Sequence, residues 1–184
     1  MPFLRISFLF SLAFQLSNLS ANEKEVQDMS DPLAVYTQIG AGSTNKGINL
    51  KVGQAYDTGI TTTAGMNVIE VKGIYGDALG WESDNKTTDS IDSFRFRNFS
   101  VDLTSMSAKQ LDASYNLNAN LVADESMDVS YSYIKALKPV GKFSFYPLAG
   151  VGASIGENAL EDDGSRDSGY SIMGAYGLIG MYAK

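Results

Sequence analysis

Residues 126–156 carry the pattern that most constrains the fold of this chain. Val129 and Tyr131 alternate with Asp128 and Ser130, and a similar alternation resumes after a short turn. Side chains along a β-strand point to opposite faces in turn, so the pattern predicts two strands, each with one apolar and one polar face. Such strands fit a sheet packed on a core in water. They equally fit a barrel wall in a bilayer, apolar toward lipid and polar toward the lumen.

Similar alternation along the rest of the chain predicts eight strands in all. Eighteen glycines and ten tyrosines with only four prolines favour strands and turns over helices. The expected strands are residues 33–42, 47–56, 65–77, 91–104, 109–118, 123–137, 142–156 and 168–183. An even number of antiparallel strands is what a bacterial barrel requires. We therefore interpret the fold as all-β, an antiparallel up-and-down transmembrane β-barrel of about eight strands.

The alternation is interrupted in three of these strands. Phe96 lies between arginines, whereas Phe99 falls in the opposite phase, so a β-bulge near Asn98 would keep all the aromatic side chains on the lipid side. Pro147 lacks a backbone N–H and predicts a bulge or a local break. Along residues 168–183 both faces are apolar, which leaves the orientation of that strand open.

The segment before the strands has the features of an export signal. Residues 1–21 combine the positive charge of Arg5, an apolar run over 6–16 and a tolerable cleavage site at Leu19–Ala21, which predicts a secretory signal peptide. The apolar run is too short for a spanning anchor helix. Residues 22–32 are polar and are expected to be a periplasmic tail, so the barrel domain takes residues 33–184.

Composition excludes several classes of function. The chain has a net charge of −7, no cysteine and no histidine, so disulfides and the commonest metal ligands are missing. An acidic chain without a basic cluster is a poor partner for nucleic acid. A serine nucleophile needs a neighbouring base such as histidine, so we expect no enzyme, no cofactor and no metal. The acidic stretch 157–167 lacks the ligand spacing of a calcium loop and is interpreted as solvated surface, with cation binding as the alternative.

Charged residues on the polar side of the strands are the main candidate site. Those expected to face the lumen are Glu70, Lys72, Arg95, Arg97, Asp102, Asp112 and Asp128. Eight strands leave an interior just wide enough for side chains, and buried charges must be paired. The prediction is therefore a lumen filled by ion pairs. A narrow channel for small solutes, lined by the same charges, is the alternative.

Aromatic residues near the turn at 138–141 form a second candidate group. They are Tyr131, Tyr133, Phe143 and Phe145. Aromatic girdles lie at the headgroup level of membrane barrels, so these residues are predicted to anchor the wall at the membrane surface. Trp81, within the polar stretch 78–90, is expected to pack in a loop or at the interface.

The chain resembles small outer-membrane β-barrels of Gram-negative bacteria, the opacity-protein and OmpA-transmembrane-like group. The features that carry the resemblance are the signal peptide, the alternating strands at Val129–Tyr133 and Lys142–Ile155, and the glycine-rich last strand. The resemblance covers residues 33–184 and rests on pattern. Such barrels usually end in an aromatic residue, whereas this chain ends Met181–Lys184. Either Tyr182 takes that role, or one or two further hairpins would make a barrel of 10–12 strands, and we favour the second interpretation.

The resemblance implies a location in the cell outer membrane and contact with outer-membrane lipid and the barrel-assembly machinery. It implies a structural or surface-interaction role, with any small solute or surface ligand unidentified. A secreted soluble β-barrel that binds a ligand is a further alternative, because alternation alone is compatible with it.

Overall fold

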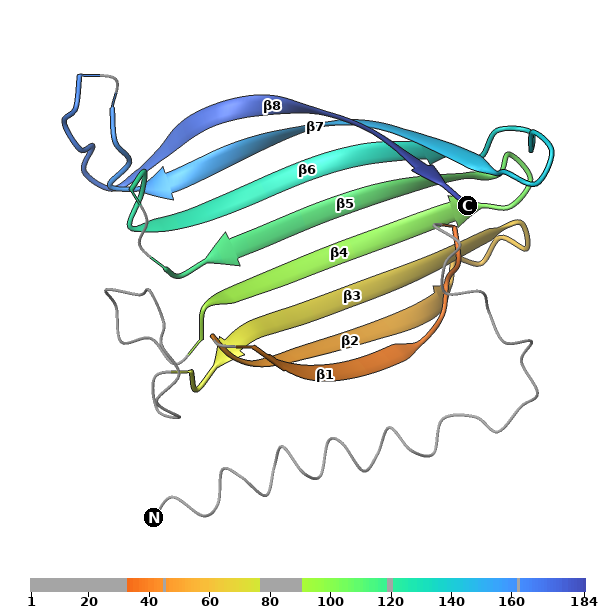
Figure 1. Ribbon diagram of the computed structural model, residues 1–184, viewed down its shortest axis with the longest axis horizontal. Helices are drawn as coiled ribbons and strands as arrows, with labels where there is room; N and C mark the ends of the chain where they lie inside the picture. The colour runs from red at the N-terminus through yellow and green to blue at the C-terminus, as the bar shows by residue number, and fades with distance from the viewer. Residues whose placement is uncertain (1–32, 45, 77–90, 119–120, 162) are drawn as a thin grey trace, which may run out of the picture.

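The computed structural model describes residues 33–44, 46–76, 91–118, 121–161 and 163–184. Within them the strands are β1 (Gln38–Thr44), β2 (Gly47–Asp57), β3 (Thr63–Ile74), β4 (Ser93–Asp102), β5 (Ser107–Asn116), β6 (Glu125–Lys135), β7 (Phe145–Glu157) and β8 (Tyr170–Ala183). They form one antiparallel sheet in sequence order (Figure 1). The predicted all-β, up-and-down architecture is confirmed. The sheet is open, with β1 and β8 at its edges, so closure into a barrel is not confirmed.

The predicted signal peptide, the polar tail up to residue 32 and Trp81 lie outside the described residues. Among those that are described, no helix has the length and apolar character needed to cross a membrane.

The sheet curls around one of its faces. One cavity on this face is lined both by Arg95 of β4 and by Tyr176 of β8, strands that are far apart in the order of the sheet. Side chains from both halves of the sheet therefore meet on this side, and it is the concave face. Figure 1 shows the curvature, with β1 and β8 bending toward the viewer.

Local interactions fix the tight connections between strands. Gly47 opens β2 at a φ of 131°, and a Cβ there would lie 2.6 Å from the carbonyl carbon of Gly73, so only glycine fits. At the end of β4, Asp102 Oδ1 accepts hydrogen bonds from the backbone N–H groups of Thr104 (2.9 Å) and Ser105 (3.2 Å). Such short side-chain-to-backbone bonds stabilise turns.

The bulge expected near Asn98 is wrong. β4 pairs with β3 and with β5 in continuous register along its whole length. Phe99 and Val101 therefore lie on the concave face, and Val101 is only 2% exposed. Phe99 lies opposite Met66, and the guanidinium of Arg97 lies over its ring at 5.8 Å. Phe99 therefore has packing partners on the inside, which makes a shift to the lipid side unnecessary.

The break expected at Pro147 is also wrong, and the irregularity lies elsewhere in β7. Pro147 pairs with Met181 without a shift, and the missing N–H falls where the ladder with β6 ends at Leu148. The register of β7 with β8 shifts instead between Ser154 and Ile155, where Met173 of β8 is the extra residue.

This bulge settles the orientation of β8, because it changes which residues share a face. Ile172 and Ile179 lie on the convex face, and Ile179 is 95% exposed. Tyr176 and Leu178 line a cavity on the concave face.

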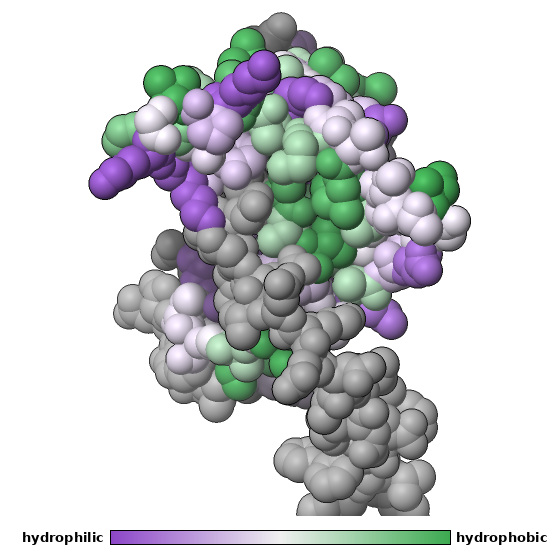
Figure 2. All heavy atoms as spheres, turned by 90° about the vertical axis from the view of Figure 1, so that its right-hand side faces the viewer, coloured by the Kyte–Doolittle hydropathy of each residue, from purple (hydrophilic) through white to green (hydrophobic). Residues whose placement is uncertain are grey.

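A hydrophobic cluster lies at one end of the concave face. Its buried members are Leu33, Val101, Ala108, Ile134 and Tyr146, from the segment before β1 and from β4 to β7. Leu33 was expected in the first strand, but β1 begins at Gln38 and Leu33 packs inward instead. Figure 2 looks at this end and shows hydrophobic residues gathered at its centre with more polar residues around them.

Candidate functional site

The strand register brings charged side chains into one row across the concave face. Cross-strand pairs align, from β2 to β7, Lys51, Glu70, Arg95, Ser114, Asp128 and Ser154. The next row toward the hydrophobic cluster aligns Val68, Arg97, Asp112 and Ser130. Cations and carboxylates from distant parts of the sequence therefore alternate around the interior.

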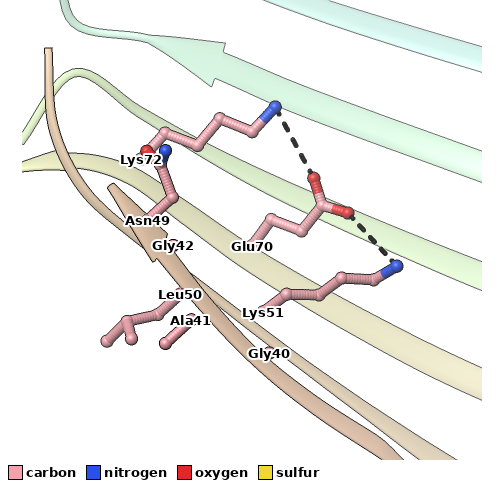
Figure 3. Close-up of a pocket in the computed structure, with 8 residues that line it drawn as sticks. All are labelled: Gly40, Ala41, Gly42, Asn49, Leu50, Lys51, Glu70 and Lys72. Atoms are coloured by element: carbon pink, nitrogen blue, oxygen red, sulfur yellow. Dashed lines mark ion pairs between the residues drawn. The ribbon is translucent and has the colours of Figure 1, made fainter. Parts of the chain in front are cut away.

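Glu70 is the centre of the first group of charges. It is 8% exposed and accepts a hydrogen bond from Arg97 Nη2. The ammonium groups of Lys72 and Lys51 lie 3.8 Å and 4.0 Å from its two carboxylate oxygens. Figure 3 shows the two lysines reaching Glu70 from either side, while Leu50 points to the opposite face. Three cations thus share one buried carboxylate.

Arg95 and Asp112 form the second group. Arg95 Nε donates to Asp112 Oδ1 at 2.9 Å and Nη2 donates to Oδ2 at 2.5 Å. Gln110 Nε2 adds a hydrogen bond of 3.1 Å to the same Oδ2. A two-point contact between guanidinium and carboxylate is a strong and directional ion pair. On the neighbouring strand, Asp128 accepts a hydrogen bond from the hydroxyl of Ser154.

The structure places the predicted lumen residues on two different faces. Glu70, Lys72, Arg95, Arg97, Asp112 and Asp128 lie on the concave face. The prediction for Asp102 is wrong. Asp102 lies on the convex face, on the same side of β4 as Phe96, and it caps the turn after β4. The predicted site does not include Lys51, which also lies on the concave face. The alternation of Lys51 with Leu50 and Val52 could have identified it.

Cavities lined by described residues adjoin the charged rows. One of about 320 Å³ is lined on its polar side by Arg95, Asp112 and Asp128. A second, of about 250 Å³, lies between Arg97 and the hydrophobic cluster. A third, of about 260 Å³, is shown in Figure 3 and lies beside Lys72.

Two rows of the convex face are apolar across the sheet. One complete row of paired residues consists of Ile39, Val52, Ile69, Phe96, Ala113, Val129, Ala153 and Ala175. The next row consists of Ala41, Leu50, Val71, Phe94, Tyr115, Met127, Ile155 and Ile172. Many of these side chains are well exposed, Ile69 at 54%. An apolar surface of this extent is unusual for a soluble monomer.

The convex face becomes more polar toward the end that holds the hydrophobic cluster. Asn98 Nδ2 donates to Asn67 Oδ1 at 2.8 Å and to Tyr56 Oη at 2.9 Å. On the same face, Tyr131 lies in the row of Asn98, and Tyr133 lies one row further. Two apolar rows thus give way to a level rich in amides and tyrosines.

The other two residues of the predicted aromatic belt lie at the start of β7. Phe145 is its first residue and shares the phase of the exposed Val151. Phe143 lies in the preceding connection and is exposed. The four aromatic residues thus gather near the same end of β6 and β7, on the convex face or beside it.

The acidic connection between β7 and β8 is held by local hydrogen bonds. Asp163 Oδ1 accepts from the backbone N–H of Ser165 at 2.9 Å and from its hydroxyl at 2.6 Å, and these bonds lower the pKa of Asp163. Arg166 pairs with Asp124 at 3.2 Å. Within the part of the chain that the structure describes, no three acidic side chains converge as metal ligands would.

Comparison with protein families, with curated proteins and with solved structures finds no match for this chain. The class is therefore defined by the fold alone. It is an all-β protein of eight antiparallel strands in up-and-down order, curled around a charged face.

Proposed function

We propose that this chain is an outer-membrane β-barrel protein with a structural or surface-interaction role, whose interior is filled by paired charges. The observation that carries the proposal is the direction of the two faces. Exposed apolar rows cross all eight strands on the convex side, and the ion pairs of Glu70 and Asp112 lie on the concave side. A soluble sheet buries its apolar face, whereas a membrane barrel presents that face to lipid.

The change of polarity along the convex face also supports this proposal. The level of Asn98, Tyr131 and Tyr133 fits the headgroup region, where amphipathic rings and amides find water and lipid together. The open edges of β1 and β8 require partners in lipid, because each unpaired backbone group there costs several kcal/mol. In this proposal they pair with each other or with further strands.

Spin labels can test the direction of the faces, and the absence of native cysteine makes single-cysteine variants clean. Ala153→Cys places the label in an apolar row of the convex face, and Ser130→Cys places it on the concave face of the neighbouring strand. In bilayers, the label at 153 should collide with dissolved oxygen and be shielded from a water-soluble nickel complex. The label at 130 should be less accessible to oxygen.

The control for this experiment is Asp163→Cys in the connection between β7 and β8, where nickel should have free access. Equal nickel access at 153 and 163 would contradict the proposal. The protein should also fractionate with outer membranes and migrate differently on gels before and after heating. Recovery from the periplasm without detergent would instead favour the soluble ligand binder.

The alternative is a narrow channel through the same barrel. One observation disfavours it. The hydrophobic cluster around Ile134 and Tyr146 lies at one end of the interior. We therefore expect no stable conductance steps from the reconstituted protein in planar bilayers. Ion-selective steps that change in Arg95→Ala would favour the channel.

A further inference from the structure

The cavity of about 250 Å³ beside Arg97 has two chemically different walls. Its polar lining consists of Tyr36, Gln38, Lys51, Arg97 and Gln110. Its apolar lining consists of Ala34, Met66, Val68, Phe99, Val101 and Ile134, which connects it with the hydrophobic cluster. This division of the walls suggests a ligand that is itself divided into a polar and an apolar part.

The polar wall is positively charged. Lys51 and Arg97 both line the cavity, and both depend on the one carboxylate of Glu70, which Lys72 also approaches. The nearby carboxylate of Asp112 is occupied by two hydrogen bonds from Arg95 and one from Gln110. No acidic side chain is among the described residues that line this cavity. An anion would restore the balance of charge.

Arg97 supplies an independent observation. Its Nε is buried and makes no hydrogen bond, although Nη2 of the same guanidinium binds Glu70. A buried donor without an acceptor is unfavourable, so native structures almost always satisfy such groups. The guanidinium is held in place by Glu70 on one side and the ring of Phe99 on the other. Arg97 is therefore a fixed cation at the wall of the cavity.

We propose that this cavity binds a small amphipathic anion. Its carboxylate, or a similar anionic head, pairs with Lys51 and Arg97, and its short apolar body lies against Phe99, Val101 and Ile134. This inference goes beyond the proposed membrane role. It depends only on the concave face, so it holds whether or not lipid surrounds the convex one.

The probe for the test is 4-fluorobenzoate, observed by fluorine NMR with the purified, folded protein. Saturable broadening of its resonance is the expected result, reversed by excess benzoate. Benzyl alcohol keeps the ring without the charge, and acetate keeps the charge without the ring. Neither should displace the probe, because each satisfies only one wall of the cavity.

Two lysine variants locate the site. Lys51→Met should weaken binding by roughly tenfold or more, as expected for loss of a charged hydrogen-bond donor. Lys72→Met is the matched control. It removes the same charge from the surroundings of the same Glu70, but Lys72 does not line this cavity, so binding should change by less than about threefold.

Three outcomes would each overturn the inference. They are the absence of saturable broadening with the native chain, displacement by benzyl alcohol as effective as by benzoate, and equal losses in the two lysine variants. The first two need no variant, so the test stands even if Lys51→Met folds poorly. Failure here would leave the spin-label result untouched, because that experiment reads the convex face and this one reads the cavity.

Discussion

Substitution of Glu70 by glutamine tests the interior ion pairs most directly. The side chain of Glu70 is 11% exposed and that of its partner Arg97 is 19% exposed, so the pair is largely removed from water. Removing one member of a buried pair leaves the other charge uncompensated, at about 3–5 kcal/mol. Lys51 and Lys72 lie farther away and are more exposed, so each should add less than about 1 kcal/mol.

We therefore expect Glu70→Gln to lower the free energy of unfolding by about 3–5 kcal/mol. The double variant Glu70→Gln, Arg97→Met should recover part of this loss, because it leaves no unpaired guanidinium. Urea unfolding in lipid vesicles, followed by the heat-dependent shift on gels, measures the change.

Asp124→Asn is the matched control for this prediction. It breaks the ion pair between Asp124, whose side chain is 47% exposed, and Arg166, whose side chain is 42% exposed. The free energy of unfolding should therefore change by less than about 1 kcal/mol. If Glu70→Gln were as mild as Asp124→Asn, the concave face would be freely hydrated. The interpretation of a filled interior would then be refuted.

Three further predictions concern the wall, a turn and the acidic connection. Phe96→Arg on the convex face should destabilise the protein in bilayers by about 2–4 kcal/mol, and Asn98→Arg by less than about 1 kcal/mol, measured by the same urea unfolding; equal effects would contradict a lipid-facing belt. Gly47→Ala should destabilise by more than about 1 kcal/mol because of its positive φ and its contact with Gly73, whereas Gly42→Ala, with open space around it, should be nearly neutral. Ser165→Ala should raise the pKa of Asp163 toward its ordinary value, because the serine hydroxyl stabilises the ionised carboxylate, and NMR titration measures this change. Since the pKa of Asp163 is lowered in the folded chain, the stability that it contributes is present above the ordinary carboxyl pKa and is lost on acidification.

The sequence predicted all eight strands because a period of two is visible without tertiary information. Val129 and Tyr131, which alternate with Asp128, are an example, and β6 follows that pattern from Met127 to Tyr133. The alternation also predicted which charges would share a face, since a charge between two apolar neighbours must point away from them. Lys51 obeys the same rule, because it lies between Leu50 and Val52.

The errors came from assuming that aromatic and apolar residues belong on the lipid side. Phe99 turns inward because Arg97 and Met66 give it a packing site, which depends on strands β3 and β4 meeting in a particular register. Asp102 lies on the convex face because β4 pairs without a bulge near Asn98 and so keeps the phase of Phe96 as far as Asp102. Both outcomes require knowledge of the neighbouring strand.

The orientation of β8 depended on a single residue. Met173 is the bulge, and the residues before and after it swap faces as a result. Met, Tyr, Ile and Leu are acceptable on either face of this strand. The alternation of residues along β8 therefore does not indicate which residue forms the bulge. The pairing with β7 supplied that information.

The cluster around Ile134 and Tyr146 makes the two ends of the concave face different, because it lies at only one of them. In the proposed barrel, this cluster would close one end of the interior, so a compound bound by the charged face would enter and leave through the other end. Such a barrel would bind a compound on one side of the membrane without transporting it.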